Sequence, residues 1–206
     1  HILKRRIAAF AFATSYLFYP SIQYSNLSDF HYVTLATTFL LFTFYFLIKQ
    51  RWQMFFLFLM LSVSTKENIA LVAALMGIYL FFLCKERLKG IIVFLTSAVY
   101  FLVTVYLVFP GLGGGAGAAG RYDYLGRNAW EIITNLLTNP GIIAGTLLVR
   151  PKITYLVHLF ASVGFLSILS PVTLLLAVSE FFLNLFSAYN PQWQVKFHYT
   201  AAITPF

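Results

Sequence analysis

Charged residues are scarce in this chain. Its 206 residues include 14 Lys and Arg and 6 Asp and Glu, so charged residues make up 10%, against about 25% in a typical soluble domain. The surface of a soluble protein cannot be built from so few charges, and 60% of the residues are hydrophobic. We therefore interpret the chain as an integral membrane protein. Its formal net charge of +8 is no sign of a nucleic-acid partner, and we expect none.

Cysteine and metal-binding motifs are also nearly missing. Cys84 is the single cysteine, so an intrachain disulfide is excluded. The histidines form no His-x-x-x-His motif and have no cysteine cluster near them, which argues against a zinc site. The glycine-rich stretch 111–120 is not followed by Lys-Ser or Lys-Thr, so it is not a nucleotide-binding phosphate loop. We predict no cofactor, and the sequence does not indicate a divalent metal.

The positive charges that are present gather at the ends of apolar segments. Eight of the 14 basic residues lie in three short clusters, formed by Lys4, Arg5, Arg6, Lys49, Arg51, Lys85, Arg87 and Lys89. The positive-inside rule places such clusters in the cytoplasm. The apolar segments that alternate with them are 7–24, 30–48, 53–84, 88–109, 153–169 and 172–188. The sequence therefore predicts an all-α, polytopic transmembrane helix bundle with about six complete spans, multi-pass in the plasma membrane.

The apolar run 53–84 is interrupted by the charged pair Lys66-Glu67. Its 32 residues would form a helix of about 48 Å, too long for one straight span. We expect a hairpin that turns at this pair, with arms too short to lift the turn clear of the membrane. Ionisable residues at that depth indicate a functional site. In the alternative interpretation Ser64 and Glu67 form a capping box, and Lys66 extends to the lipid headgroups.

The external side is predicted to carry one long loop. We expect residues 1–206 to form a single transmembrane domain, a fragment open at both ends, with 110–152 as an external loop. A helix at about 128–137 in this loop could lie in the outer interface. Glu180 falls in the middle of an apolar segment, and a carboxylate there should face protein rather than lipid.

Most acidic residues fall on the predicted outer side, which suggests chemistry on that face. The candidate substrate-binding residues are Asp29, His31, Lys66, Glu67, Arg121, Arg127 and His198. A carboxylate can accept a proton from a hydroxyl group, and Lys or Arg can stabilise a departing phosphate. This pattern suits transfer chemistry on a phosphate-bearing lipid. The same charges also suit an anion-conducting pathway, and the residues alone do not separate the two.

Short motifs in this order carry a resemblance. They are Ser28-Asp29-Phe30-His31, Thr65-Lys66-Glu67-Asn68, Tyr124-Leu125-Gly126 and His198-Tyr199. The series resembles that of the bacterial and archaeal membrane-protein family catalogued as domain of unknown function 2079. The chain departs from the family pattern at Tyr32 and Asn68, where that pattern usually has Pro and Asp. The family is itself similar to the multi-spanning glycosyltransferases of the C-type fold.

The resemblance implies an activity and a location. It implies transfer of a sugar from a polyprenyl-phosphate donor on the extracytoplasmic face of a bacterial or archaeal plasma membrane. The expected partners are then membrane lipid and the lipid-linked sugar. The catalytic Asp of such enzymes usually lies in the first external loop, which would be upstream of His1, so the catalytic base is unassigned. A transporter or flippase and a non-catalytic membrane subunit remain as alternatives.

Overall fold

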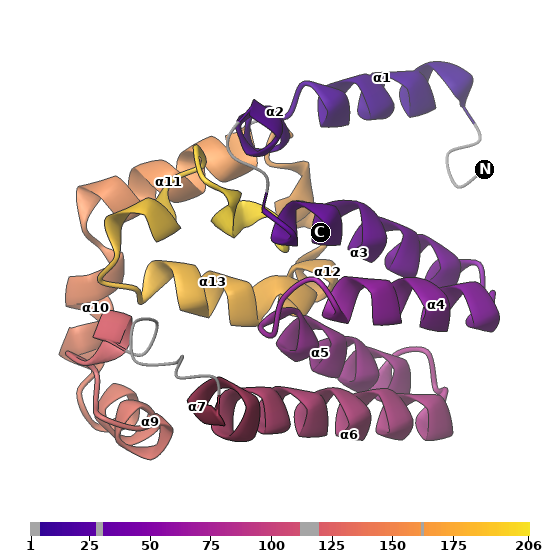
Figure 1. Ribbon diagram of the computed structural model, residues 1–206. Coiled ribbons are helices and arrows are strands. Elements are labelled where there is room, and N and C mark those ends of the chain that lie inside the picture. Colours follow the sequence, from indigo (N-terminus) through magenta and orange to yellow (C-terminus); the bar gives the residue numbers. More distant parts are fainter. Residues whose placement is uncertain (1–4, 28–30, 112–119, 162) are drawn as a thin grey trace.

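The computed structural model describes residues 5–27, 31–111, 120–161 and 163–206. Within these ranges every regular element is a helix, so the all-α prediction is confirmed for them (Figure 1). The α-helices are α1 (Arg6–Leu17), α2 (Pro20–Leu27), α3 (Val33–Ile48), α4 (Trp52–Val63), α5 (Ile69–Phe82), α6 (Arg87–Val103), α7 (Phe109–Gly111), α9 (Ala129–Thr138), α10 (Pro140–Leu147), α11 (Arg150–Ala161), α12 (Pro171–Leu174) and α13 (Val178–Leu185). A π-helical turn, η1 (Thr104–Val108), joins α6 to α7, and the 3-10 helices are η2 (Gly120–Tyr122), η3 (Leu166–Leu169), η4 (Leu175–Ala177), η5 (Asn190–Trp193) and η6 (His198–Thr200).

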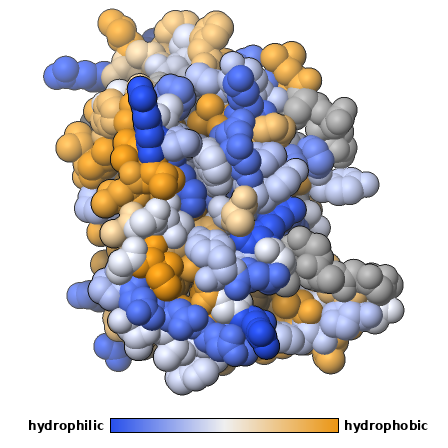
Figure 2. All heavy atoms as spheres, turned by 90° about the vertical axis from the view of Figure 1, so that its left-hand side faces the viewer, coloured by the Kyte–Doolittle hydropathy of each residue, from blue (hydrophilic) through white to orange (hydrophobic). Residues whose placement is uncertain are grey.

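The helices α3 to α6 run back and forth beside one another (Figure 1). Their connections α3–α4 and α5–α6 therefore meet at one end, which we call the basic end. There the Nζ of Lys89 lies 4.1 Å from the ring centroid of Trp52 and 2.6 Å from Oε2 of Glu86. The opposite end, called here the outer end, carries α9 to α11. Figure 2 looks onto the outer end and shows hydrophilic residues over much of it, with a hydrophobic area along one side.

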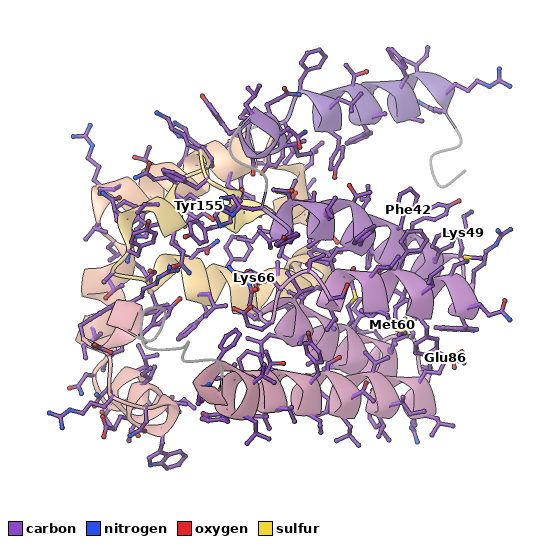
Figure 3. The ribbon with its side chains drawn as sticks, in the orientation of Figure 1. Phe42, Lys49, Met60, Lys66, Glu86 and Tyr155 are labelled. Atoms are coloured by element: carbon purple, nitrogen blue, oxygen red, sulfur yellow. The ribbon has the colours of Figure 1, made fainter. Side chains whose placement is uncertain are left out.

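The predicted turn at Lys66-Glu67 is confirmed. Helix α4 ends at Val63 and α5 begins at Ile69. Figure 3 shows Lys66 at the turn of this hairpin, far from Lys49 and Glu86 at the basic end. The two arms contain 12 and 14 residues, which corresponds to only about 18 and 21 Å of helix. The charged pair is half-buried in the turn between α4 and α5, and the next residue, Asn68, contacts α13.

The predicted number of complete spans is not confirmed. One helix of the described residues, Arg87–Gly111, is long and apolar enough to cross a membrane by itself. The pair Pro140–Leu147 and Arg150–Ala161 meets the same requirement only when joined, and it is bent by 66°. The remaining apolar helices, among them Val33–Ile48 and Pro171–Leu185, have 10–17 residues. The external placement of 110–152 stays a prediction, and its residues 112–119 lie outside the described ranges.

Two predicted spans are each broken in the structure. The apolar segment 7–24 is predicted to form one span, but α1 ends at Leu17 and a new helix begins at Pro20. Proline is favoured at a first helical position because its missing N–H would have no partner there. The segment 153–169 is also divided, because Gly164 and Phe165 adopt φ of 61° and 59°. This left-handed turn is typical of a helix C-terminus.

The core lies between α3, α4 and α5, where Leu40, Phe55 and Met76 are buried. The C-terminal segment packs on this core, and Thr37 Oγ1 donates a hydrogen bond of 2.7 Å to the carbonyl of Ala201. The end of α13 is held from outside the core. The buried Lys152 of α11 donates its Nζ to the carbonyl of Leu185, and a cation at a helix C-terminus is favourable.

Helices α5 and α6 approach closely because each has a glycine at the contact. A Cβ at Gly77 would lie 2.6 Å from the backbone N of Phe94, and one at Gly90 would lie 2.7 Å from the carbonyl oxygen of Gly77. These neighbours are backbone atoms, so neither can move aside without displacing a helix. Small residues at such crossings let helices in membranes pack tightly.

We expect Gly90→Ala to destabilise the fold by about 1–3 kcal/mol, because the added methyl overlaps the backbone of α5. Gly145→Ala is the matched control, since Gly145 lies in helix α10 with nothing within 4 Å of its Cβ position. Thermal unfolding in detergent would measure both. Equal melting temperatures for the two variants would show that α5 and α6 are not packed in this way.

Candidate functional site

A cavity of about 340 Å³ lies between the hairpin turn, α13 and the end of α6. We call it the central cavity. Its polar and aromatic lining residues are Lys66, Glu67, Asn68, Arg121, Tyr122, Glu180, Asn184, Gln192, His198 and Tyr199. Its apolar lining residues are Val33, Leu71, Phe101, Val105, Phe109, Leu183 and Ala202. Four of the seven residues predicted from the sequence, Lys66, Glu67, Arg121 and His198, therefore line one cavity.

The local structure at the turn tests the capping box expected for Ser64 and Glu67. Helix α5 begins at Ile69 with Asn68 as its N-cap residue, and the Asn68 side chain makes no capping bond. Ser64 instead donates its hydroxyl to the carbonyl of Leu61 in α4, at 2.8 Å. The capping-box interpretation is wrong, because residues 64–68 form the turn between α4 and α5. Ser64 lies at the start of this turn and not at the start of α5. Lys66 thus enters the cavity from a tight turn.

Two cations meet on one aromatic ring in this cavity. The Nζ of Lys66 lies 5.5 Å from the ring centroid of Tyr199, and the guanidinium carbon of Arg121 lies 5.8 Å from it. Arg121 also lies 4.6 Å from the ring of Tyr189. Among the described residues the one ion pair is Lys89–Glu86, so Glu67 does not pair directly with Lys66. The two positive charges repel one another and would attract an anionic group, and the carboxylates of Glu67 and Glu180 line the same cavity.

A hydrogen-bond network fixes Arg121. Its Nη1 donates to Oε1 of Gln192 at 3.1 Å. The amide nitrogen of Gln192 donates in turn to the hydroxyl of Tyr122 and the carbonyl of Leu183, at 3.1 and 2.9 Å. Gln192 is buried, so its orientation is defined by these partners. The guanidinium group is thereby held at the cavity before any ligand binds.

Glu180 lines the same cavity as these cations. It is 2% exposed, and Nδ2 of Asn68 lies 2.8 Å from both of its carboxylate oxygens. The prediction that Glu180 faces protein is confirmed. One helical turn later, the buried Asn184 donates to the carbonyl of Tyr199 at 2.9 Å. Residues four apart share a helix face. The spacing of Glu180 and Asn184 in an apolar segment is therefore the sequence pattern from which a role for Asn184 could have been predicted.

The rings of the two histidines of the predicted set are in contact. The rings of His31 and His198 have centroids 3.7 Å apart and planes at 32°. His198 lies in η6, outside the apolar helices. The pKa of His198 is lowered to about 4, mainly by burial and in addition by the nearby charges of His31, Lys66 and Arg121. His198 is therefore neutral near pH 7, and its contact with His31 joins the start of α3 to the C-terminal segment.

Two of the predicted site residues that the structure describes, His31 and Arg127, do not line the cavity. Arg127 lies at the start of the α9 region, where its backbone N–H donates to Oε2 of Glu131 at 2.8 Å, and it does not line the cavity. Asp29 lies outside the described residues. Sequence reasoning did not select Tyr122, Asn184 or Gln192, because their roles depend on contacts between distant segments.

The cavity is lined by both polar and apolar residues. The apolar residues come from α5, α6, η1 and α7, including Leu71, Phe101, Val105 and Phe109. The polar residues include the two cations, the carboxylates and the side-chain amides. Within the described residues no three His, Cys, Asp or Glu side chains are grouped to hold a metal ion. This arrangement can hold a ligand with an anionic head group and an apolar chain.

We expect Glu180→Gln to fold and Glu180→Lys to fail. The amide keeps an acceptor for Asn68, whereas an ammonium at this buried position puts a second positive charge near Lys66 and faces the donor Nδ2 of Asn68. The yield of monodisperse protein in detergent measures this, with Glu131→Lys on the exposed α9 as the control for charge reversal. Equal yields of the two Glu180 variants would contradict the buried position of this residue.

We expect the stability of the protein to fall as the pH falls from about 6.5 to about 4. The pKa of His198 is about 4 in the folded protein, below its ordinary value of about 6.5. Between these values the unfolded chain binds more protons, so the free energy of unfolding decreases toward low pH. The measurement compares wild type with His198→Asn by thermal unfolding at pH 7.5 and pH 5. An equal loss of stability in both proteins would show that His198 does not contribute.

Comparisons with known proteins place the chain at the level of a family. No curated protein and no solved structure matches it. The sequence model of one family, described as "Predicted membrane protein (DUF2079)", matches residues 1–206. A membrane location agrees with the low charge content and with the apolar helix Arg87–Gly111. The chain belongs to this family of predicted membrane proteins, the domain of unknown function 2079.

Proposed function

We propose that the protein is a membrane glycosyltransferase that takes a sugar from a polyprenyl-phosphate donor on the extracytoplasmic face. The observation that carries the proposal is the pair of cations, Lys66 and Arg121, on the ring of Tyr199. They lie in a cavity that is also lined by apolar residues. A lipid phosphate has the two properties that such a cavity matches, a charged group and a hydrocarbon chain.

In the proposed complex each part of the donor meets a different side of the cavity. The phosphate accepts charge-assisted hydrogen bonds from Lys66 and Arg121. The polyprenyl chain lies against the apolar residues of α6 and α7, including Phe101 and Phe109. The sugar hydroxyls face Gln192 and the polar face of α13. Because Gln192 already holds Arg121, less ordering entropy is lost when the phosphate binds.

The chemistry needs little from the cations beyond stabilisation of the leaving group. The oxygen of an acceptor hydroxyl forms a bond to the anomeric carbon while the bond from that carbon to the phosphate oxygen breaks. The departing phosphate gains negative charge, which Lys66 and Arg121 stabilise. The proton of the acceptor hydroxyl passes to a carboxylate base, which we leave unassigned.

The proposed orientation puts the basic end in the cytoplasm and the central cavity toward the outer interface. The connections that carry Lys49 and Lys89 support it, because they meet at one end of the bundle (Figure 1). Helix α9 supports it from the other end. Its Trp130 and Leu137 are 75% and 79% exposed, and exposed apolar residues on one helix face suit a helix lying in the membrane interface. About six crossings remain part of this proposal.

A transporter or flippase for the same lipid is the second candidate. The bent pair α10 and α11, at 66°, favours it, because broken helices are typical of transporter binding sites. Both candidates predict binding of a lipid phosphate in the central cavity. Transfer of a labelled sugar to an acceptor, against movement of the intact lipid across a vesicle membrane, separates them.

We expect Lys66→Ala to weaken the binding of a polyprenyl phosphate about ten- to a hundredfold, because a charge-assisted hydrogen bond contributes about 1.5–3 kcal/mol. Arg127→Ala is the matched control, since Arg127 is on the same side of the protein but outside the cavity. Binding is measured in nanodiscs with folded protein. Affinities that are the same for wild type, Lys66→Ala and Arg127→Ala would remove Lys66 from the site.

A further inference from the structure

A second hollow lies at the outer end, apart from the central cavity. It consists of two adjoining cavities of about 500 and 300 Å³, which share His158, Val195 and Lys196. We call the two together the outer groove. The larger cavity is bounded by the start of α11 and by η5 with the residues that follow it, and the smaller one continues to Tyr19 and Tyr24 near α2. Their shared residues make the groove longer than either cavity.

The chemistry of the groove is cationic, polar and aromatic. Arg150 and Lys196 are exposed and positively charged, and none of the described lining residues is acidic. Thr154, Asn190 and Gln194 supply a hydroxyl and side-chain amides. The aliphatic lining residues are Pro151 and Val195 in the larger cavity and Pro20, Ala161 and Val195 in the smaller one, and the other apolar lining surface is aromatic. The groove therefore matches a ligand with hydroxyl groups and negative charge better than it matches a lipid tail.

Trp193 provides a fixed aromatic surface in this groove. Its Nε1 donates to the carbonyl of Ser187 at 3.2 Å, which sets the orientation of the ring. An indole held in this way presents a flat apolar face, and the apolar face of a sugar ring can stack on it. Gln194 Nε2 donates to Oδ1 of Asn190 at 3.0 Å, so the amides beside Trp193 are also ordered.

The groove and the central cavity are built on two sides of the same segment. In η5, Gln192 lines the central cavity and Trp193 lines the groove. A second link is the hydrogen bond of 3.2 Å from Nδ2 of Asn184, in the central cavity, to the hydroxyl of Tyr155, in the groove. A ligand in the groove is thus separated from the central cavity by one layer of side chains.

We propose that the outer groove binds the acceptor, and that this acceptor is an acidic saccharide, with carboxylate or phosphate groups on its sugar units. Arg150 and Lys196 bind the negative groups, Trp193 stacks on a sugar ring, and the amides of Asn190 and Gln194 bind hydroxyls. The assignment as acceptor rests on the proposed transferase function. Binding of the acidic saccharide itself does not, because it depends only on the residues of the groove.

The test measures binding of a short oligogalacturonate to the full chain in phosphatidylcholine nanodiscs. Trp193 is followed by fluorescence in a background with Trp52→Phe and Trp130→Phe, which leaves it as the one tryptophan. A neutral maltooligosaccharide of the same length is the ligand control. Lys49→Ala is the protein control, because Lys49 lies at the opposite end of the molecule (Figure 3).

We expect oligogalacturonate to change the Trp193 emission, and the neutral saccharide to bind at least tenfold more weakly. Arg150→Ala and Lys196→Ala should each weaken oligogalacturonate binding about five- to tenfold, whereas Lys49→Ala should not. Both side chains are exposed, so the variants should fold. Added salt should weaken the interaction, since exposed charges are screened.

Three results would overturn the proposal. The first is equal affinity for the acidic and the neutral saccharide, and the second is unchanged affinity in both groove variants. The third is a Trp193 response to phosphatidylglycerol in the nanodisc but none to oligogalacturonate, which would assign the groove to the anionic membrane surface.

Polyprenyl-phosphate binding, measured on the same proteins, keeps this proposal separate from the proposed function. Arg150→Ala and Lys196→Ala should leave that affinity unchanged, and Lys66→Ala should leave oligogalacturonate binding unchanged. If wild type binds the saccharide but not the lipid phosphate, the proposed transferase function is contradicted and the proposed saccharide site in the outer groove is supported. The reverse result would remove the groove alone.

Discussion

The hydrogen bonds between Asn68 and Glu180 are the contact on which the central cavity depends. They join the hairpin turn to α13 across 112 positions of sequence. A buried carboxylate is costly unless its oxygens are satisfied, so Glu180 ties α13 to the one turn that offers a donor there. Lys152 holds the other end of α13 at the carbonyl of Leu185. Part of the polar lining of the cavity is thus carried by a helix fixed at both ends.

The positions of the two cations in the cavity depend on these contacts of the turn and α13. Arg121 is oriented by Gln192, and Lys66 projects from the turn that Asn68 anchors. Both lie over Tyr199, whose carbonyl is held by Asn184 of α13. Arg121 is therefore positioned by a neutral amide, and Lys66 forms no ion pair among the described residues, although the Glu67 and Glu180 carboxylates line the same cavity. An arrangement of this kind keeps positive charge available for a ligand, whereas an ion pair would neutralise it.

Local rules predicted the parts of the fold that depend on neighbouring residues. The turn at Lys66-Glu67 follows from the length of the apolar run and from basic residues on both sides of it, and the span at Arg87–Gly111 follows from its composition. The break at Gly164 and Phe165 was missed, because an apolar segment gives no sign of a left-handed turn. The contact of His31 with His198 was missed as well. It joins segments that only the packing of α3 against the C-terminal segment brings together, and no pattern in the sequence encodes that.

The π-helical turn Thr104–Val108 affects how the apolar wall of the cavity can change. A π turn contains one residue more than an α turn, and one residue corresponds to about 100° of rotation along a helix. Val105 lies in this turn and Phe109 follows it, and both line the cavity. Deleting a single residue there would restore regular α-helix and turn Phe109 to a different direction, while the preceding α6 (Arg87–Val103) kept its place. A one-residue insertion or deletion at this point would therefore change the shape of the apolar lining of the cavity, with no change in its polar residues.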